Sequence, residues 1–380
     1  MKLLRISGLL LLASLAGCST ISGWFGGKKH VRQPAELTEF KQSAGLEVRW
    51  HQGVGSAGST VLQPAVTHDA IYAANAKGEV FRLDPATGKE VWRADSGFEV
   101  TGGVGAGSGL VLVGGLKGDV AAFGEDGKLR WKVKASSEVL SAPQASGEFV
   151  VVRTGDGRIA GLSVVDGKRQ WLYERATPAL IVRSHAGVSI ARGLVFAGFA
   201  GGRMALINLN NGIAAWEAMV SQPRGNTELE RISDITSAPA ADNEQVCAVA
   251  FQGSVGCFDL YQGSLLWNRE LSSDKGLALS GRFLFVSDAD GNVYGLDKAT
   301  GSSVWKNEQL SLRRTTAPYP IGDYVAVGDF EGYLHLLNRE DGAMAARLKL
   351  GGVIDGPPIG VEGGMLVQTR DGELYSIAIR

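Results

Sequence analysis

The chain has 380 residues, 53 of them glycine, and its 38 basic side chains nearly balance its 39 acidic ones. Nucleic-acid binding needs a basic surface, so this balance argues against a nucleic-acid partner. The length predicts two ordinary domains, unless the chain is a tandem repeat that forms a single ring. No segment has a convincing helical periodicity, which indicates an all-β fold.

The N-terminus has the features of a bacterial lipoprotein signal peptide. Basic residues, a short apolar stretch at 6–13 and two small residues precede Cys18, a spacing that resembles the lipobox. The apolar stretch is shorter than the about 20 residues that cross a bilayer. We predict a signal peptide over residues 1–17 and a diacylglycerol on the Cys18 thiol. The alternative is an ordinary signal peptide followed by a chance cysteine.

Residues 18–45 are predicted to be a flexible tether between the lipid and the folded part. Ser, Gly, Lys and Pro are frequent from Ser19 to Gly45, as is typical of linkers. Ser19, directly after the cysteine, resembles lipoproteins that are sorted to the outer membrane. The sequence therefore predicts a lipid-anchored protein on the periplasmic face of the outer membrane, with its folded domain over residues 46–380.

A unit of about 40 residues recurs eight times along the chain. Its clearest copy, residues 77–92, has a glycine at a hairpin turn, a short β run, an Asp-x-x-Thr-Gly turn and a tryptophan that begins another strand. The first glycines are Gly78, Gly118, Gly157, Gly202, Gly253, Gly291, Gly332 and Gly372. The tryptophans are Trp92, Trp131, Trp171, Trp216, Trp267 and Trp305, and the seventh copy has Ala346. Since a propeller blade takes about 40–45 residues, we predict an eight-bladed β-propeller with four antiparallel strands per blade.

The eighth copy is incomplete and predicts how the ring closes. After Gly372 the chain supplies one strand, Glu373 to Ile379, and ends before a tryptophan strand. The missing strand is present at the other end of the domain, at Leu46 to Trp50. We therefore predict that the N-terminal strand completes the C-terminal blade, which removes two strand edges. Trp50, like the six other tryptophans, is predicted to pack its indole against the neighbouring blade.

Two repeats are longer than the others. The excess residues fall at Arg175 to Ser189 and at Val220 to Thr236, on either side of the fourth blade. Loops on a rigid scaffold often carry recognition, which makes these insertions candidate binding loops. The alternative is that insertions are tolerated anywhere on a surface.

Catalytic and metal-binding motifs are missing from the sequence. The five histidines lie far apart, without metal-ligand spacing. Residues 288–292 faintly resemble a calcium loop but lack its glutamate and coincide with the hairpin turn of a blade. No nucleotide-binding glycine motif and no G-x-S-x-G elbow occurs. We therefore expect no enzyme activity, cofactor or metal ion.

Cys247 and Cys257 flank the turn near Gly253. A three-residue loop would place them opposite each other, whereas a two-residue loop would place them on opposite faces of the sheet. An oxidising periplasm permits a disulfide. The register is open in the sequence, so both a disulfide and two buried free thiols remain, and the free thiols are the expectation.

The repeated motif D-x-x-T-G-x-x-x-W, at residues 84–92 and 297–305, resembles the tryptophan-docking motif of pyrroloquinoline-quinone (PQQ) propellers. Periplasmic quinoprotein dehydrogenases share this motif, but they are longer and carry calcium ligands and a catalytic Asp in insertions that this sequence lacks. The lipobox, the near-minimal blades and the eight copies resemble the BamB family of the outer-membrane β-barrel assembly (BAM) complex over essentially the whole mature chain. Residues 227–234 and 328–335 also resemble segments of this family.

The resemblance implies a non-enzymatic scaffold, a monomer within the BAM complex, that binds the POTRA domains of BamA and assists the folding and insertion of outer-membrane β-barrels. By position, Leu180, Val182, Arg183 and Asp234 match the partner-binding surface, and Thr236 replaces a second acidic residue. Packing of Leu180 and Val182 beneath their own loop is the alternative. The other candidate functions are a minimal PQQ-dependent periplasmic oxidoreductase and a carbohydrate-binding propeller.

Overall fold

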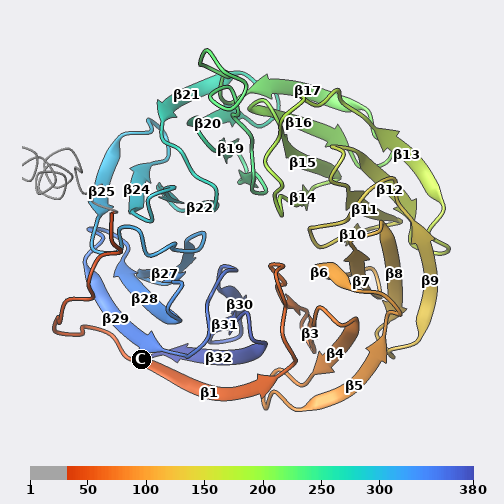
Figure 1. Cartoon of the computed structure of the whole chain (residues 1–380), viewed down its shortest axis with the longest axis horizontal. Helices are drawn as coiled ribbons and strands as arrows, with labels where there is room; N and C mark the ends of the chain where they lie inside the picture. Colours follow the sequence, from red (N-terminus) through yellow and green to blue (C-terminus); the bar gives the residue numbers. More distant parts are fainter. Residues whose placement is uncertain (1–31) are drawn as a thin grey trace, which may run out of the picture. The chain divides into compact units, whose positions relative to one another are not determined.

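The computed structural model describes residues 32–380, which form 32 β-strands and no helix. The strands make eight four-stranded antiparallel sheets, which are arranged as the blades of a ring (Figure 1). The described residues thus contain no helix that is long and apolar enough to cross a membrane. The predicted eight-bladed propeller is confirmed.

Seven blades are continuous in sequence, and in each the strands run from the centre of the ring outward in chain order (Figure 1). Blade one comprises β2 (Ala65–Val66), β3 (Ile71–Ala74), β4 (Glu79–Leu83) and β5 (Glu90–Asp95). Blade two comprises β6 (Val100–Gly107), β7 (Leu110–Gly115), β8 (Asp119–Gly124) and β9 (Leu129–Lys134). Blade three comprises β10 (Gln144–Ser146), β11 (Phe149–Arg153), β12 (Ile159–Ser163) and β13 (Arg169–Tyr173).

The next four blades repeat this arrangement. Blade four comprises β14 (Val188–Ala191), β15 (Leu194–Phe199), β16 (Arg203–Asn208) and β17 (Ala214–Met219). Blade five comprises β18 (Ala240–Ala241), β19 (Gln245–Val249), β20 (Ser254–Asp259) and β21 (Leu265–Glu270). Blade six comprises β22 (Gly276–Ser280), β23 (Phe283–Ser287), β24 (Val293–Asp297) and β25 (Ser303–Asn307). Blade seven comprises β26 (Tyr319–Ile321), β27 (Tyr324–Gly328), β28 (Tyr333–Asn338) and β29 (Met344–Lys349).

The eighth blade is built from both ends of the folded domain. Its inner strands are β30 (Ile359–Val361), β31 (Gly364–Gln368) and β32 (Glu373–Ile379), and its outer strand is β1 (Leu46–Gly53). β1 pairs antiparallel with β32, from Leu46 opposite Ile379 to Gly53 opposite Glu373. The predicted closure of the ring by the N-terminal strand is therefore confirmed.

Burial along the strands follows from their place in a blade. The second strand of a blade is packed on both faces by neighbouring blades, so β7 and β19 are buried at every residue. The outermost strand has one free face, so in β21 only Trp267 is buried, while Leu265 and Leu266 are exposed. The tryptophan is thus the residue through which an outer strand contacts the next blade.

Each junction between blades, except that from blade seven to blade eight, contains the same tryptophan contact. The indole Nε1–H donates to a backbone carbonyl in the Asp-x-x-Thr-Gly turn, or its equivalent, of the next blade. The seven donor–acceptor distances are 2.7–3.1 Å, for Trp50, Trp92, Trp131, Trp171, Trp216, Trp267 and Trp305. The indole also lies on the glycine of that turn. At Gly212, where φ is +72°, an added Cβ would lie 2.6 Å from the Trp171 indole, so glycine is required there for both conformation and space.

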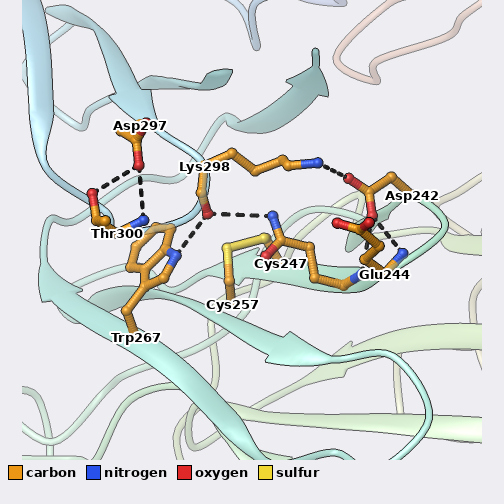
Figure 2. The surroundings of a disulfide bond; sticks show 9 residues. Asp242, Glu244, Cys247, Cys257, Trp267, Asp297, Lys298 and Thr300 are labelled. Carbon is orange, nitrogen blue, oxygen red and sulfur yellow. Dashed lines mark hydrogen bonds and ion pairs between the residues drawn. A yellow bond between two sulfur atoms is a disulfide. The ribbon is translucent and has the colours of Figure 1, made fainter. Parts of the chain in front are cut away.

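The junction from blade five to blade six shows the contact with its supporting bonds (Figure 2). Trp267 Nε1 donates to the Lys298 carbonyl at 2.8 Å, and Lys298 Nζ pairs with Asp242 at 2.5 Å. Asp297 accepts hydrogen bonds from both the amide and the hydroxyl of Thr300, at 2.9 and 2.8 Å, which fixes the turn. The Asp and Thr of the repeated motif therefore hold the carbonyl in place for the indole of the preceding blade.

Cys247 and Cys257 form a disulfide beside this tryptophan (Figure 2). They lie directly opposite each other on β19 and β20, with Cα atoms 4.1 Å apart. The expectation of two free thiols is wrong. The Ala250 amide donates to the Ser254 carbonyl at 3.0 Å, which leaves a three-residue loop at 251–253 and brings both cysteine side chains to one face. Gln252 rather than Gly253 takes the left-handed conformation in this turn, with φ of +50°.

The described part of the predicted tether lies partly against the ring. The compact unit begins at Ala35, whose amide donates to the Ser311 carbonyl at 2.8 Å. Leu37 and Phe40 are partly buried against blades six and seven, and the Ser43 amide donates to the Ala345 carbonyl at 2.9 Å. The predicted signal peptide and Cys18 lie outside the described residues.

The ring has two faces, which differ in the loops they carry. Successive strands of a blade alternate in direction, so the blade-to-blade connections and the turns between second and third strands lie on one face. We call this the connection face. The Asp-x-x-Thr-Gly turns lie on the opposite face. Both insertions, between β13 and β14 and between β17 and β18, therefore emerge on the connection face.

Loss of one tryptophan contact is expected to destabilise the ring. Trp171 is 7% exposed and its Nε1 lies 2.7 Å from the Leu209 carbonyl. We expect Trp171→Ala to lower the free energy of unfolding by about 3–5 kcal/mol, because a large cavity and an unpaired carbonyl result. Trp171→Phe keeps a large aromatic side chain but loses the hydrogen bond, and should lower the free energy of unfolding by about 1–2 kcal/mol. Urea unfolding followed by circular dichroism would measure both, and equal stability of wild type and Trp171→Ala would contradict the role of the contact.

The disulfide is expected to stabilise blade five. Both cysteines are fully buried, so a reductant reaches them only when the blade opens. Closing so short a loop in the unfolded chain contributes about 2–3 kcal/mol. Dithiothreitol should therefore lower the urea midpoint of the wild type and leave the midpoint of a Cys247→Ala/Cys257→Ala variant unchanged. An equal response of the two proteins would show that the disulfide does not contribute.

Candidate partner-binding surface

The connection between β13 and β14, residues 174–187, projects apolar and basic side chains into solvent. Leu180 and Ile181 are 44% and 40% exposed, and Arg183 is exposed beside them, whereas Val182 is half-buried. Leu180 therefore does not pack beneath its own loop. Arginine is enriched at the centres of protein interfaces, and exposed apolar side chains beside it lose their water when a partner binds.

The buried Asp234 side chain holds the backbone of this loop. It lies in the connection between β17 and β18 and is 4% exposed. One carboxylate oxygen accepts a hydrogen bond from the Val182 amide at 2.7 Å, and the other accepts one from the Gly201 amide at 2.9 Å. The side chain expected to be an acidic contact on the surface thus joins the two long connections to the β15–β16 turn. Asp234 thus holds the backbone at Val182, between Leu180 and Arg183.

Arg153 is a member of this surface that the sequence did not reveal. It ends β11 and, together with Asp234, Ile181, Arg183 and Phe199, lines a pocket of about 200 Å³. Its guanidinium carbon lies 5.5 Å from the centre of the Phe199 ring. Burial lowers the pKa of Arg153 to about 10, and the Asp234 carboxylate partly opposes this shift. A strand-ending arginine in a single sequence looks like any exposed arginine, so no signal could have identified it.

The second long connection, residues 220–239, has internal order of its own. Glu230 accepts hydrogen bonds from the amides of Asn226 and Thr227 at 2.8 and 3.1 Å, which lowers the pKa of its carboxyl group. The Thr227 hydroxyl in turn accepts from the Glu230 amide at 3.2 Å. This reciprocal pattern is that of a capping box, and it presents Leu229 to solvent at 68% exposure.

The residues of the ring do not suit a metal ion. No group of three or more His, Cys, Asp or Glu side chains in residues 32–380 has metal-ligand geometry. The acidic residues that line the central pocket of about 460 Å³ are Asp274 and Asp355. Asp274 pairs with Lys275 at 2.8 Å and Asp355 with Arg370 at 2.6 Å, so both charges are already compensated. The described residues therefore do not fit the calcium that accompanies the quinone in dehydrogenases of this fold.

The eight blades, the repeated turn and the tryptophan contacts define a propeller built from PQQ-like repeats. A family model described as Outer membrane protein assembly factor BamB matches residues 76–307. The BamB of Nitrosomonas eutropha is 38% identical, over 100% of this chain and 96% of its own length. The crystal structure of BamB from Moraxella catarrhalis has a TM-score of 0.82 at 28% identity and covers 88% of this chain and 100% of that one.

The chain belongs to the BamB family of outer membrane protein assembly factors. A quinohemoprotein alcohol dehydrogenase from Comamonas testosteroni also matches, with a TM-score of 0.71 over 87% of this chain and 76% of its own. Its identity of 12% shows a shared fold alone.

Removing the charge of Asp234 is expected to loosen the exposed loop without unfolding the ring. In Asp234→Asn only one side-chain oxygen remains, so one of the Val182 and Gly201 amides loses its acceptor and faces an NH2 group. Hydrogen exchange at the amide that loses its acceptor, either that of Val182 or that of Gly201, should rise at least about tenfold.

Thr236→Val is the matched control for this substitution. Thr236 is buried two residues away, and its hydroxyl has no hydrogen-bond partner among the described residues. Exchange at Val182 and Gly201 should therefore stay at the wild-type rate in this variant. If exchange at the Val182 and Gly201 amides also stays at the wild-type rate in Asp234→Asn, the carboxylate does not hold the loop.

Proposed function

We propose that the protein is a non-enzymatic scaffold of the BAM complex that binds the POTRA domains of BamA through the connection face of blades three to five. The observation that carries this proposal is the loop 174–187. It exposes Leu180, Ile181 and Arg183 while Asp234 holds its backbone. Membership of the BamB family supports the assembly role, because its members are named as outer membrane protein assembly factors.

The physical chemistry of the loop suits a protein partner of mixed character. The two apolar side chains would lose their water on binding, and Arg183 would donate charge-assisted hydrogen bonds to an acceptor on the partner. POTRA domains are small α/β modules with sheet edges, so an exposed backbone segment could also pair with a partner strand. The loop is held at Val182 before binding, so less conformational entropy is lost on association.

We further propose that the ring is held at the periplasmic face of the outer membrane by a lipid on Cys18. The chain between Cys18 and Ala35, where the compact unit begins, can span at most about 60 Å. The ring would thus stay within one domain length of the bilayer, where barrel precursors are inserted. In this proposal the protein acts as a monomer within the complex, and it assists folding and insertion by positioning BamA rather than by catalysis.

A PQQ-dependent oxidoreductase is the second candidate, and the ring gives it no specific support. The likeness to quinohemoprotein dehydrogenases extends to the fold alone. The acidic residues at the central pocket are paired with Lys275 and Arg370. We therefore retain the scaffold as the proposed function.

Charge reversal at Arg183 is expected to weaken the proposed complex. Arg183→Glu should reduce capture of the BamA POTRA domains at least about tenfold, because an unpaired acidic group replaces a donor at the centre of the contact. Arg169→Glu makes the same change in charge on the outer strand of blade three, away from the loop, and should bind as wild type. Pull-down of purified POTRA domains from a dilution series measures both variants. Equal capture by wild type and Arg183→Glu would exclude Arg183 from the interface.

A further inference from the structure

The junction between blades seven and eight lacks the contact that joins the other blades. The outer strand β29 has Ala346 where the seven other blades carry tryptophan. The turn that would receive an indole cannot exist there, because the third and fourth strands of blade eight, β32 and β1, come from opposite ends of the domain. One of the eight junctions therefore needs another way to hold its outer strand.

Residues 35–45 run from the connection between β25 and β26 to this junction, which residues 43–45 reach. The Ser43 and Ala44 amides both donate to the Ala345 carbonyl on β29, at 2.9 and 3.2 Å. Gly45 exchanges two backbone hydrogen bonds with Arg380, at 3.0 and 2.9 Å, and so extends the pairing of β1 with β32. Ala44 is buried in the core cluster that also contains Ala346. The segment thus occupies the junction at the position where tryptophan is missing.

The middle of the segment packs on the outside of blade seven. Phe40 lies under the guanidinium of Arg347, with the Arg347 carbon 5.0 Å from the ring centre. Arg347 also donates to the Thr38 carbonyl at 3.2 Å. Leu37 and Phe40 contact the core cluster of Phe283, Trp305 and Met344. These contacts bury apolar surface that would otherwise face solvent beside β29.

The far end of the segment is held by Arg313, which is 3% exposed. Its Nη1 donates to the Ala35 carbonyl at 3.0 Å, its Nε donates to Asp329 at 2.7 Å, and its Nη2 pairs with Glu331. All three nitrogens of the guanidinium are therefore engaged. A lysine could not reproduce this arrangement, since it carries a single nitrogen.

The carboxylate that positions Arg313 is itself fixed from several sides. Burial raises the pKa of Asp329, but hydrogen bonds from His335, the Tyr333 amide and Arg313 lower it further, to below its ordinary value. Burial lowers the pKa of His335, which lies 3.0 Å from the carboxylate. Arg313 thus has an ionised partner in the interior of blade seven.

The backbone around Arg313 is also constrained. Leu312 and Arg314, its two neighbours, adopt left-handed conformations with φ of +58° and +54°. Such conformations are unfavourable for residues other than glycine and persist where the surrounding structure fixes them. In the connection between β25 and β26, Arg313 is thus buried between the half-buried Leu312 and the exposed Arg314.

We propose that residues 35–45 form a clasp that closes the ring at the junction without tryptophan, and that Arg313 fastens this clasp. The clasp holds β1 against β32 and carries the chain to Ala35, on the connection face. A pull on the N-terminal segment would then act on Arg313 and blade seven before it acts on the β1–β32 pairing. Without the clasp, β29 would be the one outer strand of the ring that is held by its pairing in the sheet alone, with no tryptophan contact to the next blade.

The test compares three variants of the full mature chain. Arg313→Lys keeps the charge beside Asp329 but loses the bond to Ala35. Arg314→Lys is the matched control, because Arg314 is exposed and pairs with Asp355 only at 3.9 Å. Leu37→Ala/Phe40→Ala loosens the clasp from its own side and leaves the Arg313 contacts in place. The measurements are the rate of trypsin cleavage after the exposed Lys41 and deuterium uptake by peptides covering residues 44–53.

We expect cleavage after Lys41 and deuterium uptake at residues 44–53 to rise roughly tenfold or more in Arg313→Lys and in the double variant. Arg314→Lys should match the wild type, and uptake in β2–β5 should stay constant in all four proteins. If Arg313→Lys behaves as Arg314→Lys, Arg313 does not fasten the segment. If the double variant is cleaved faster but uptake at residues 44–53 does not change, the segment is not a clasp. If Arg313→Lys destabilises blade seven as a whole, deuterium uptake in β27 and β28 will rise. The clasp is then tested by uptake at residues 44–53 in the Leu37→Ala/Phe40→Ala variant, which keeps Arg313.

Discussion

The structure depends on one contact that is repeated around the ring, the tryptophan of one blade on the glycine of the next. The contact combines burial of a large ring, a hydrogen bond from Nε1 and a close approach that only glycine permits. Each indole reaches a backbone carbonyl in the next turn, and in two of these turns an Asp and a Thr hold the loop that carries this carbonyl, so the contact fixes both distance and rotation between neighbours. Repetition of a fixed rotation makes a closed ring, so blade number follows from a local interaction.

A ring fixed in this way leaves its connections free to differ. The connections beside blade four are longer than the others. Their buried residues, such as Val220 and Ile235, pack in the core of the ring, and Asp234 joins the two connections to each other. The tryptophan contacts lie on the opposite face from the long loops, so in the proposed function stability and partner binding depend on different residues. Substitutions in the loops can therefore alter binding while the ring keeps its shape.

The fold was predictable from the sequence because its determinants are local and periodic. The spacing of Gly88 and Trp92, repeated along the chain, predicted the blades, and the incomplete last copy predicted the pairing of Leu46 to Trp50 with the last strand. What could not be predicted depends on register or on contacts distant in sequence. The Cys247–Cys257 pairing required the exact length of one turn, and a shift of one residue would have separated the thiols.

The candidate site was predictable only in part, for the same reason. Leu180 and Arg183 are exposed as a binding loop requires, but the burial of Asp234 arises from amides on two other connections, 52 and 33 residues away. Arg153 reaches the site from the end of β11. The segment from Ala35 to Gly45 has the composition of a linker, and its contacts with Arg313 and Arg347 depend on residues some 300 positions later. Composition therefore misjudges a segment whose partners are at the other end of the chain, and a ring, by bringing its two ends together, is the fold in which this error is most expected.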